Sequence, residues 1–151
     1  GKFNALDLIL NHLPNNYNNC YDLFGGGATV SINLKSKKII YNEINTYVVE
    51  LLNYLSKTDP IDNYKNIQKY IKKYGLEKGN KEAYYKLRED YNNRKSPILL
   101  YLLICFGFEH QIRFNSKFEF NNPCGNSGFN DEMYEKLISF YLVSNEKKNR
   151  I

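Results

Sequence analysis

Tyr21-Asp22-Leu23-Phe24-Gly25-Gly26-Gly27-Ala28-Thr29-Val30 is a short apolar run with one acid, then three glycines, then a helical pattern. The stretch predicts a strand that enters a tight turn, followed by a helix that begins near Ala28. Glycines permit backbone angles and a close approach of a ligand that side chains forbid. The unpaired N–H groups of the following helix would point at the same place. The stretch therefore favours a nucleotide-sized site, although such turns are also common where nothing binds.

The segments on both sides of this turn predict a parallel sheet. Apolar residues at helical spacing predict a helix over residues 6–13, and Pro14 ends it. Residues 30–34 are assigned to the helix after the turn, residues 38–41 to a second strand, and the apolar positions of residues 48–55 to another helix. This alternation of helices and strands is typical of a doubly wound parallel α/β sheet.

Glu43 stands at the end of the second predicted strand, 21 residues after Asp22. Nucleotide-binding sheets carry a carboxylate about 20 residues after the glycine turn, where it binds ribose hydroxyls. The alternative is a solvated acid at the start of the next helix, a position that favours acids electrostatically. The spacing makes Glu43 a candidate ribose ligand.

A helical region follows. Residues 58–93 carry charged helices, led in by Asp59-Pro60, with tyrosines and aliphatic residues in stripes that we assign to the core. The lysines of this region form the outer face, where they serve solvation or contact phosphates. Ser96-Pro97 starts a segment over residues 98–106 that is apolar on all sides and predicts a buried helix. Because no parallel-sheet pattern occurs here, we interpret the region as an inserted helical domain.

A β-hairpin is predicted after the buried helix. Ile112 and Phe114, then Phe118 and Phe120, alternate on either side of residues 115–117. Such a ribbon fits the major groove of DNA, and arginine and asparagine side chains pair with base edges. Arg113 and Asn115 would share one face, since strand side chains alternate. Hairpins with these residues also occur in proteins that bind no DNA.

Composition limits the classes of partner and of binding site that the chain can have. The chain has 151 residues, a formal net charge of +5 and a pI near 9.0, which fit a polyanionic partner or simply a basic surface. Its three cysteines are odd in number and lack a C-x-x-C spacing, so we predict reduced thiols, with Cys105 in the core. His110 has no second histidine near it, which argues against a metal site. No membrane span or secretion signal is evident, and we expect a cytoplasmic protein.

Taken together, these features resemble the Dam-like class of adenine-specific DNA methyltransferases, found in T-even phages and in many restriction–modification systems. The resemblance runs along nearly the whole chain in the family's order, and the hairpin is its most specific part. It rests on residues 22–27 with 30–33, residues 42–45, residues 86–92, and the hairpin segments 111–115 and 119–123.

The resemblance implies a Rossmann-like methyltransferase sheet with an inserted helical target-recognition domain that carries the hairpin. Residues 1–57 would bind S-adenosylmethionine, residues 58–129 would read DNA with the hairpin at about 111–121, and residues 130–151 would return to the rest of the methyltransferase domain.

The implied site residues fall into two groups. Gly1 and Lys2 resemble the end of the family's Gly-x-x-Lys cofactor motif. Arg113, Asn115 and Pro123 match base-contacting positions. The implied cofactor residues are Lys2, Asp22, Phe24, Gly25, Gly26 and Glu43. The implied DNA contacts are Phe108, Glu109 and His110 in a loop pushed into the duplex, with Gln111, Arg113, Asn115, Pro123 and Ser127, and with Asn130 on a phosphate.

The sequence also departs from the family. Phe118 stands where the family has a glycine, and a bulky residue resists the left-handed conformation, so a different turn is expected. Asn126-Ser127 replaces an arginine of the members that read GATC, which removes roughly 1–3 kcal/mol of discrimination at that base. GATC is therefore not assigned as the target.

The family's Asp-Pro-Pro-Tyr segment is absent from these 151 residues. We therefore expect an amino-terminal fragment of a methyltransferase that is inactive alone, with double-stranded DNA as partner and with the remaining part or a cognate restriction endonuclease system beside it. One alternative is a non-catalytic DNA-binding module. Another is a nicotinamide-dependent oxidoreductase, which the glycine turn and Glu43 alone would suggest.

Overall fold

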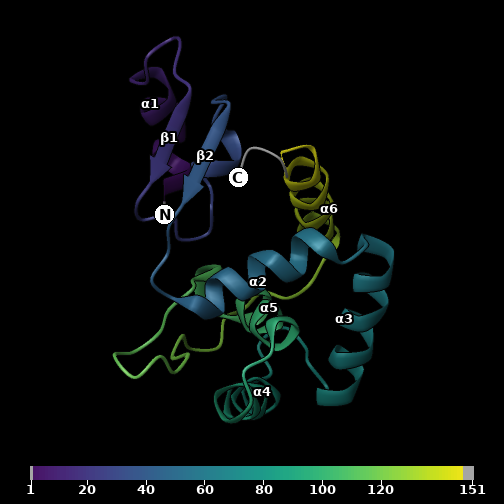
Figure 1. Cartoon of the computed structure of the whole chain (residues 1–151). Helices are drawn as coiled ribbons and strands as arrows, with labels where there is room; N and C mark the ends of the chain where they lie inside the picture. The colour runs from purple at the N-terminus through teal and green to yellow at the C-terminus, as the bar shows by residue number, and fades with distance from the viewer. Residues whose placement is uncertain (1, 148–151) are drawn as a thin grey trace.

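The computed structural model describes residues 2–147 and shows two parallel strands beside a group of packed helices (Figure 1). Short 3-10 turns cover Lys2–Ala5, Ser31–Asn33 and Phe108–His110. Gly1 and the end of the predicted return segment, residues 148–151, lie outside the described residues. The strands are β1 (Asn19–Asp22) and β2 (Lys38–Tyr41), and the α-helices are α1 (Leu6–Asn11), α2 (Thr46–Lys57), α3 (Pro60–Tyr74), α4 (Lys81–Asn93), α5 (Pro97–Phe106) and α6 (Asp131–Glu146).

The two predicted strands pair in parallel, as expected. Asn19 lies opposite Lys38 and Asp22 opposite Tyr41. The pairing continues past the strand ends, because the Asn42 N–H donates to the Asp22 carbonyl at 2.9 Å. The prediction of a parallel α/β arrangement is thus confirmed for two strands, and the larger doubly wound sheet stays a prediction.

The prediction of a helix that begins near Ala28 was wrong. Ala28 has φ 61°, in the left-handed region that an α-helix cannot contain, and only the 3-10 turn Ser31–Asn33 follows. The Asn33 side chain donates to the Thr29 carbonyl at 2.7 Å and closes this compact loop. The β-branched residues of the segment do not favour a helix, and fully buried Leu34 anchors the loop to the protein.

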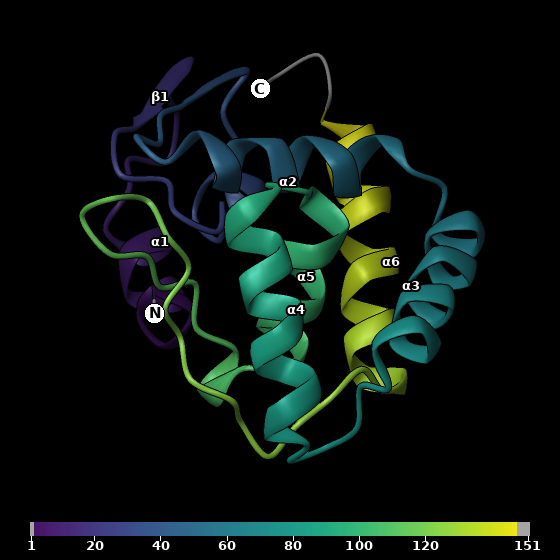
Figure 2. The same cartoon turned by 90° about the horizontal axis from the view of Figure 1, so that it is seen from below.

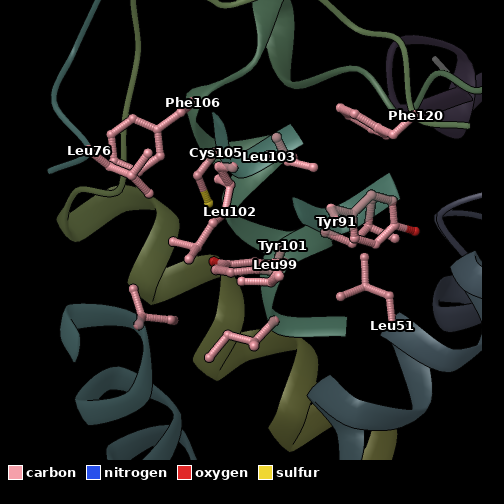
Figure 3. Close-up of a cluster of buried hydrophobic side chains, with 14 of the residues drawn as sticks. Leu51, Leu76, Tyr91, Leu99, Tyr101, Leu102, Leu103, Cys105, Phe106 and Phe120 are labelled. Atoms are coloured by element: carbon pink, nitrogen blue, oxygen red, sulfur yellow. The ribbon is translucent and has the colours of Figure 1, made fainter. Parts of the chain in front are cut away.

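The helices pack around α5, which Figure 2 shows behind α4 and between the other helices. Its sequence is apolar on all sides, and Leu99, Leu102, Leu103 and Cys105 are almost fully buried (Figure 3). The predictions of a buried helix here and of a core position for Cys105 are confirmed. The tyrosine stripe of α4 contributes Tyr84 and Tyr91 to the same core.

Side-chain caps fix most helix starts. Asp59 accepts hydrogen bonds from the N–H groups of Ile61 and Asp62, with Pro60 in the first turn. Asn45, Asn80 and Asn130 cap α2, α4 and α6 in the same manner. Helix α2 begins directly after the sheet and packs against α5 and α6, so it joins the sheet to the helical core. Among residues 2–147, no helix is long and apolar enough to cross a membrane.

Candidate functional site

The glycine turn after β1 is tied to the end of β2 by hydrogen bonds. The Gly26 N–H donates to Glu43 Oε2 at 2.8 Å, and the Tyr41 hydroxyl donates to the Gly26 carbonyl at 2.6 Å. Burial, followed by the charges of Glu43 and Asp22, raises the pKa of Tyr41, so its hydroxyl stays protonated as a donor. The turn is therefore held in one conformation by the next strand.

Glu43 also organises the start of α2. Its Oε1 accepts from the Asn45 N–H at 2.9 Å, so the carboxylate bridges the glycine turn and the helix cap. Each carboxylate oxygen has a second lone pair for a further donor. Glu43 thus acts at the start of α2, which was the alternative interpretation of its sequence position. Its carboxylate can still accept a hydrogen bond from a ligand hydroxyl.

Asp22 faces inward rather than toward solvent. Its side chain is 8% exposed, accepts from the Ser31 hydroxyl at 2.7 Å and lies 3.7 Å from the Lys2 ammonium. Lys2 also donates to the Phe24 carbonyl. The Phe24 side chain itself is 82% exposed beside the turn. Asp22 and Lys2 therefore support the turn, while the Phe24 ring and the Glu43 carboxylate are the groups that a ligand could contact.

The predicted cofactor residues all meet at this turn: Lys2 contacts Asp22 and Phe24, and Glu43 contacts Gly26.

The predicted hairpin is present only in part, and we call residues 111–121 the recognition loop. A single antiparallel bridge joins Phe114 to Phe120, in place of two regular strands. The Asn115 N–H donates to the Glu119 carbonyl at 2.9 Å, and the Asn121 N–H to the Arg113 carbonyl at 3.0 Å. The strand pairing ends at this bridge, because the residues between Asn115 and Glu119 form a turn closed by hydrogen bonds within the loop.

Asn115 was predicted to share one face of the hairpin with Arg113, and in the structure its side-chain amide is bonded within the loop. Its Oδ1 accepts from the N–H groups of Lys117 and Glu119 at 2.9 and 3.0 Å, and its Nδ2 donates to Glu119 Oε2 at 2.7 Å. Asparagine commonly closes turns in this way. The exposed Arg113 guanidinium makes no hydrogen bond or ion pair within residues 2–147. The Arg113 guanidinium is therefore available to a partner.

Phe118 does not change the turn in the predicted way. It has φ 58° and occupies the left-handed conformation that glycine would supply. Its half-exposed ring helps to line a cavity of about 420 Å³ between the recognition loop and the glycine turn. The cavity is also lined by Gly26, Glu43, Ile44, Ile112 and Phe114. Figure 2 shows the loop beside the start of α2 on this side of the molecule.

The segment Phe108–His110 is exposed and has an unusual backbone. Glu109 and His110 have φ 49° and 52°, two consecutive left-handed residues that are not glycine. His110 Nδ1 lies 3.0 Å from the Ile104 carbonyl, and Gln111 Nε2 donates to Glu109 Oε2 at 2.9 Å. These contacts hold a strained conformation next to the recognition loop.

The remaining predicted DNA contacts have structural partners. The Pro123 carbonyl accepts from the Phe108 N–H at 2.9 Å, and the Pro123 ring is exposed. The Ser127 hydroxyl donates to the Cys105 carbonyl at 3.1 Å, at the end of α5. Asn130 accepts from the Met133 N–H as the cap of α6. Ser127 and Asn130 therefore already take part in helix ends.

The sequence reasoning did not single out a set of polar residues on α4 that hold the end of the recognition loop. Tyr84, Arg88 and Asn92 are spaced four residues apart, so they lie on one face of the helix, and all three bond to backbone groups of residues 120–122. The signal in the sequence was this spacing, inside the stretch 86–92 that resembles the family.

Metal binding finds no support in the described part of the chain, because residues 2–147 contain no group of three or more His, Cys, Asp or Glu that could hold an ion. Cys20, Cys105 and Cys124 are all unpaired thiols, as predicted.

Comparison with known proteins places the chain among DNA methyltransferases. The chain is 41% identical over 149 residues to the type II methyltransferase M.FokI of Planomicrobium okeanokoites, covering 97% of this chain and 23% of that protein. It is 39% identical over 142 residues to the modification methylase StsI of Streptococcus sanguinis, covering 93% and 22%. It is 30% identical over 130 residues to the DNA adenine methylase of Escherichia coli K12, covering 83% and 45%.

The chain thus spans about a quarter of the length of the first two relatives and less than half of the third. The sequence pattern described as "D12 class N6 adenine-specific DNA methyltransferase" matches residues 1–149. The glycine turn, Glu43 and the recognition loop all lie inside that match. The chain belongs to the D12 class of N6 adenine-specific DNA methyltransferases.

Proposed function

We propose that this chain supplies the S-adenosylmethionine-binding wall and the DNA-recognition loop of a site-specific methyltransferase that acts on the exocyclic amine of adenine. The observation that carries the proposal is the position of the glycine turn with Glu43, which faces the recognition loop across one cavity. A cofactor and a DNA site on the two sides of that cavity would be close to each other.

The residues of the glycine turn are of the chemical types that can bind S-adenosylmethionine. Glu43 has free lone pairs for ribose hydroxyls, Phe24 presents an exposed ring, and Gly25 and Gly26 allow close backbone approach. When bound, the cofactor supplies an electrophilic methyl group on a sulfonium. The role of this chain is to hold it in place, with Lys2 and Asp22 fixing the turn from behind.

The recognition loop fits duplex DNA. Arg113 is exposed and unpaired within the described residues, and its guanidinium can donate two hydrogen bonds to O6 and N7 of a guanine. The basic net charge of +5 favours association with the phosphate backbone. Adenine must leave the stack before its amine can react, and the exposed, strained segment Phe108–His110 is placed beside the loop for entry into the duplex.

We further propose that residues 1–57 form the cofactor-binding part and residues 58–129 the target-recognition part. Residues 130–151 would lead back to the rest of the methyltransferase domain. The adenine amine needs a carboxylate or amide and a backbone carbonyl to accept its N–H bonds, and the Asp-Pro-Pro-Tyr segment that would provide them is not among these residues. The 151-residue chain by itself is therefore proposed to be inactive, and the full-length gene product to carry the activity.

Calorimetric titration of the full-length gene product with S-adenosylhomocysteine tests the cofactor part. Glu43→Gln and Glu43→Ala should weaken binding by about 10–100-fold, the effect of one charge-assisted hydrogen bond. Glu50→Ala, an exposed glutamate on α2, is the matched control and should leave binding unchanged. Tight binding by both Glu43 variants would contradict the assignment, and thermal unfolding without ligand separates binding from stability.

The DNA part is tested with Arg113→Ala and Lys117→Ala, two exposed cations of the same loop. Arg113→Ala should cost about 1–3 kcal/mol of discrimination at one base of the target. Lys117→Ala should weaken binding to all sequences alike and lower the salt dependence. Equal behaviour of the two variants would contradict base reading by Arg113.

A further inference from the structure

The recognition loop is held by an asparagine of a neighbouring helix. Asn92, near the end of α4, donates from Nδ2 to the Phe120 carbonyl at 3.0 Å. Its Oδ1 accepts from the Phe120 N–H at 2.8 Å. The amide therefore bonds both backbone groups of one residue, as a neighbouring strand does in a hydrogen-bonded pair. Asn92 replaces the strand partner that the short recognition loop lacks.

The orientation of this amide is fixed by Lys95. The Lys95 ammonium donates to Asn92 Oδ1 and to the Asn92 carbonyl, each at 3.2 Å. It also lies over the rings of Tyr47 and Tyr91, at 5.3 and 4.9 Å from their centroids. Two donors thus face Oδ1, so a flipped amide would place its NH₂ group against an ammonium and an N–H.

Phe120 links Asn92 to the part of the loop that carries Arg113. It is the bridge partner of Phe114, and the two rings meet edge to face with centroids 5.3 Å apart. Phe114 also stacks on Tyr47 in the first turn of α2. Arg113 directly precedes Phe114, so it points to the opposite, solvent side. The position of Phe120 therefore sets where the Arg113 guanidinium stands relative to the helices.

The same face of α4 also holds Asn122, directly after the loop, and through it the segment before the loop. The Tyr84 hydroxyl donates to the Asn122 carbonyl at 3.0 Å, and Arg88 donates to the same oxygen at 3.3 Å. Asn122 in turn donates from Nδ2 to the Phe108 carbonyl at 3.0 Å. One helix thus holds both segments to which DNA contacts were assigned.

We infer that Asn92 is a positioning residue for DNA recognition: by fixing Phe120 it sets the register of the recognition loop and the direction of Arg113. The inference rests on the proposed function. It predicts that loss of the Asn92 amide leaves the helical core folded but lets the loop move, so Arg113 reads its base with less precision. Methylation should then become less selective rather than merely slower.

The test uses the full-length gene product with S-adenosylmethionine and plasmid DNA from a host without adenine methylation. Single-molecule sequencing gives the methylation rate at the wild-type site and at sites that differ from it by one base pair. The ratio of these rates is the discrimination ratio. Asn92→Ala removes both hydrogen bonds to Phe120, and Asn92→Asp keeps the acceptor but loses the donor. Asn93→Ala, an exposed asparagine next to it, is the matched control.

The discrimination ratio of Asn92→Ala should fall tenfold or more, that of Asn92→Asp should fall less, and that of Asn93→Ala should not change. A folded Asn92→Ala protein with the wild-type ratio, even at a lower overall rate, would overturn the positioning role and leave the proposed function intact. If Asn92→Ala does not fold, Asn92→Asp is judged by the same criterion, and unfolding of both would show a purely structural residue. A wild-type protein that methylates no DNA would overturn the proposed function itself.

Discussion

At the scale of single residues, the site depends on backbone conformations that side chains disfavour. Ala28, Glu109, His110 and Phe118 all have φ between 49° and 61°. Left-handed conformations cost L-residues roughly 1–2 kcal/mol each, and they persist where surrounding contacts impose them. Three of the four lie in or beside the recognition loop, and the fourth closes the glycine turn.

Phe118 allows this backbone cost to be measured. Phe118→Gly and Phe118→Ala both remove the ring, but only glycine relieves the left-handed backbone. The glycine variant should be more stable than the alanine variant by about 1 kcal/mol, after the greater freedom of glycine in the unfolded chain is deducted. Urea unfolding of both proteins gives the difference. Equal stabilities would mean that the loop relaxes and that no strain is held there.

The glycine turn offers a second matched pair. A Cβ atom at Gly25 would overlap the ring of Tyr41, whereas a Cβ at Gly27 would meet open space. Gly25→Ala should therefore displace Tyr41 from the Gly26 carbonyl, destabilise the protein by about 1–3 kcal/mol and weaken S-adenosylhomocysteine binding. Gly27→Ala should unfold at the wild-type temperature. Calorimetry checks both, and similar effects of the two substitutions would count against this packing.

At the scale of elements, helices were predictable and loops were not. Asp59-Pro60 and Ser96-Pro97 start α3 and α5 as the sequence indicates, because a first-turn proline acts locally, and in α3 the Asp59 side chain also caps the helix. Residues 30–34 were assigned to a helix that begins near Ala28, because the apolar spacing says nothing of the left-handed backbone of Ala28. The recognition loop was taken for a regular hairpin, although Asn115 closes it with side-chain bonds that alternation does not reveal.

Helix α4 gives a prediction of its own. The Tyr84 hydroxyl bonds the Asn122 carbonyl, whereas the buried Tyr91 hydroxyl has no hydrogen-bond partner within residues 2–147. Tyr84→Phe should destabilise the protein by about 1 kcal/mol, and Tyr91→Phe should be neutral or stabilising, because it removes an unpaired buried polar group. Denaturant unfolding of the two variants is the measurement. A larger loss in Tyr91→Phe than in Tyr84→Phe would contradict the hydrogen-bond pattern.

At the scale of the whole molecule, the glycine turn and the recognition loop are brought together by tertiary contacts between distant segments. Tyr47 follows the Glu43 region by a few residues and stacks on Phe114, and Lys95 lies over Tyr47. The residues of each half could be named from the sequence and from the family resemblance. Their mutual position, and the role of α4 in it, depend on packing between segments far apart in the chain.

Stability should fall in alkali because several buried groups resist ionisation. Burial raises the pKa of the Cys105 thiol to about 12. It also raises the pKa values of Tyr101 and Tyr91 above the ordinary tyrosine value. Once pH exceeds the ordinary values of 9.0 for cysteine and 10.0 for tyrosine, the unfolded chain loses protons that the folded chain keeps. Each such group then lowers the free energy of unfolding by about 1.4 kcal/mol per pH unit, until its folded form also ionises.

Urea midpoints at pH 8, 9.5 and 10.5 test this. A small decrease is expected from pH 8 to 9.5, where the cysteine contributes, and a larger one from pH 9.5 to 10.5, where the tyrosines contribute as well. The Tyr101→Phe variant should decrease less steeply. A midpoint that stays constant to pH 10.5 would show that these groups ionise without unfolding.

The proposed methyl transfer to adenine can be measured on DNA that has been exposed to the protein in a cell. The full-length gene product is expressed in a host without DNA methylation, and the host DNA is examined by nucleoside mass spectrometry and by sequencing of methylated positions. N6-methyladenine is expected at one recurrent sequence, and Arg113→Ala should reduce that selectivity. Folded protein that leaves no N6-methyladenine, or that methylates cytosine instead, would contradict it.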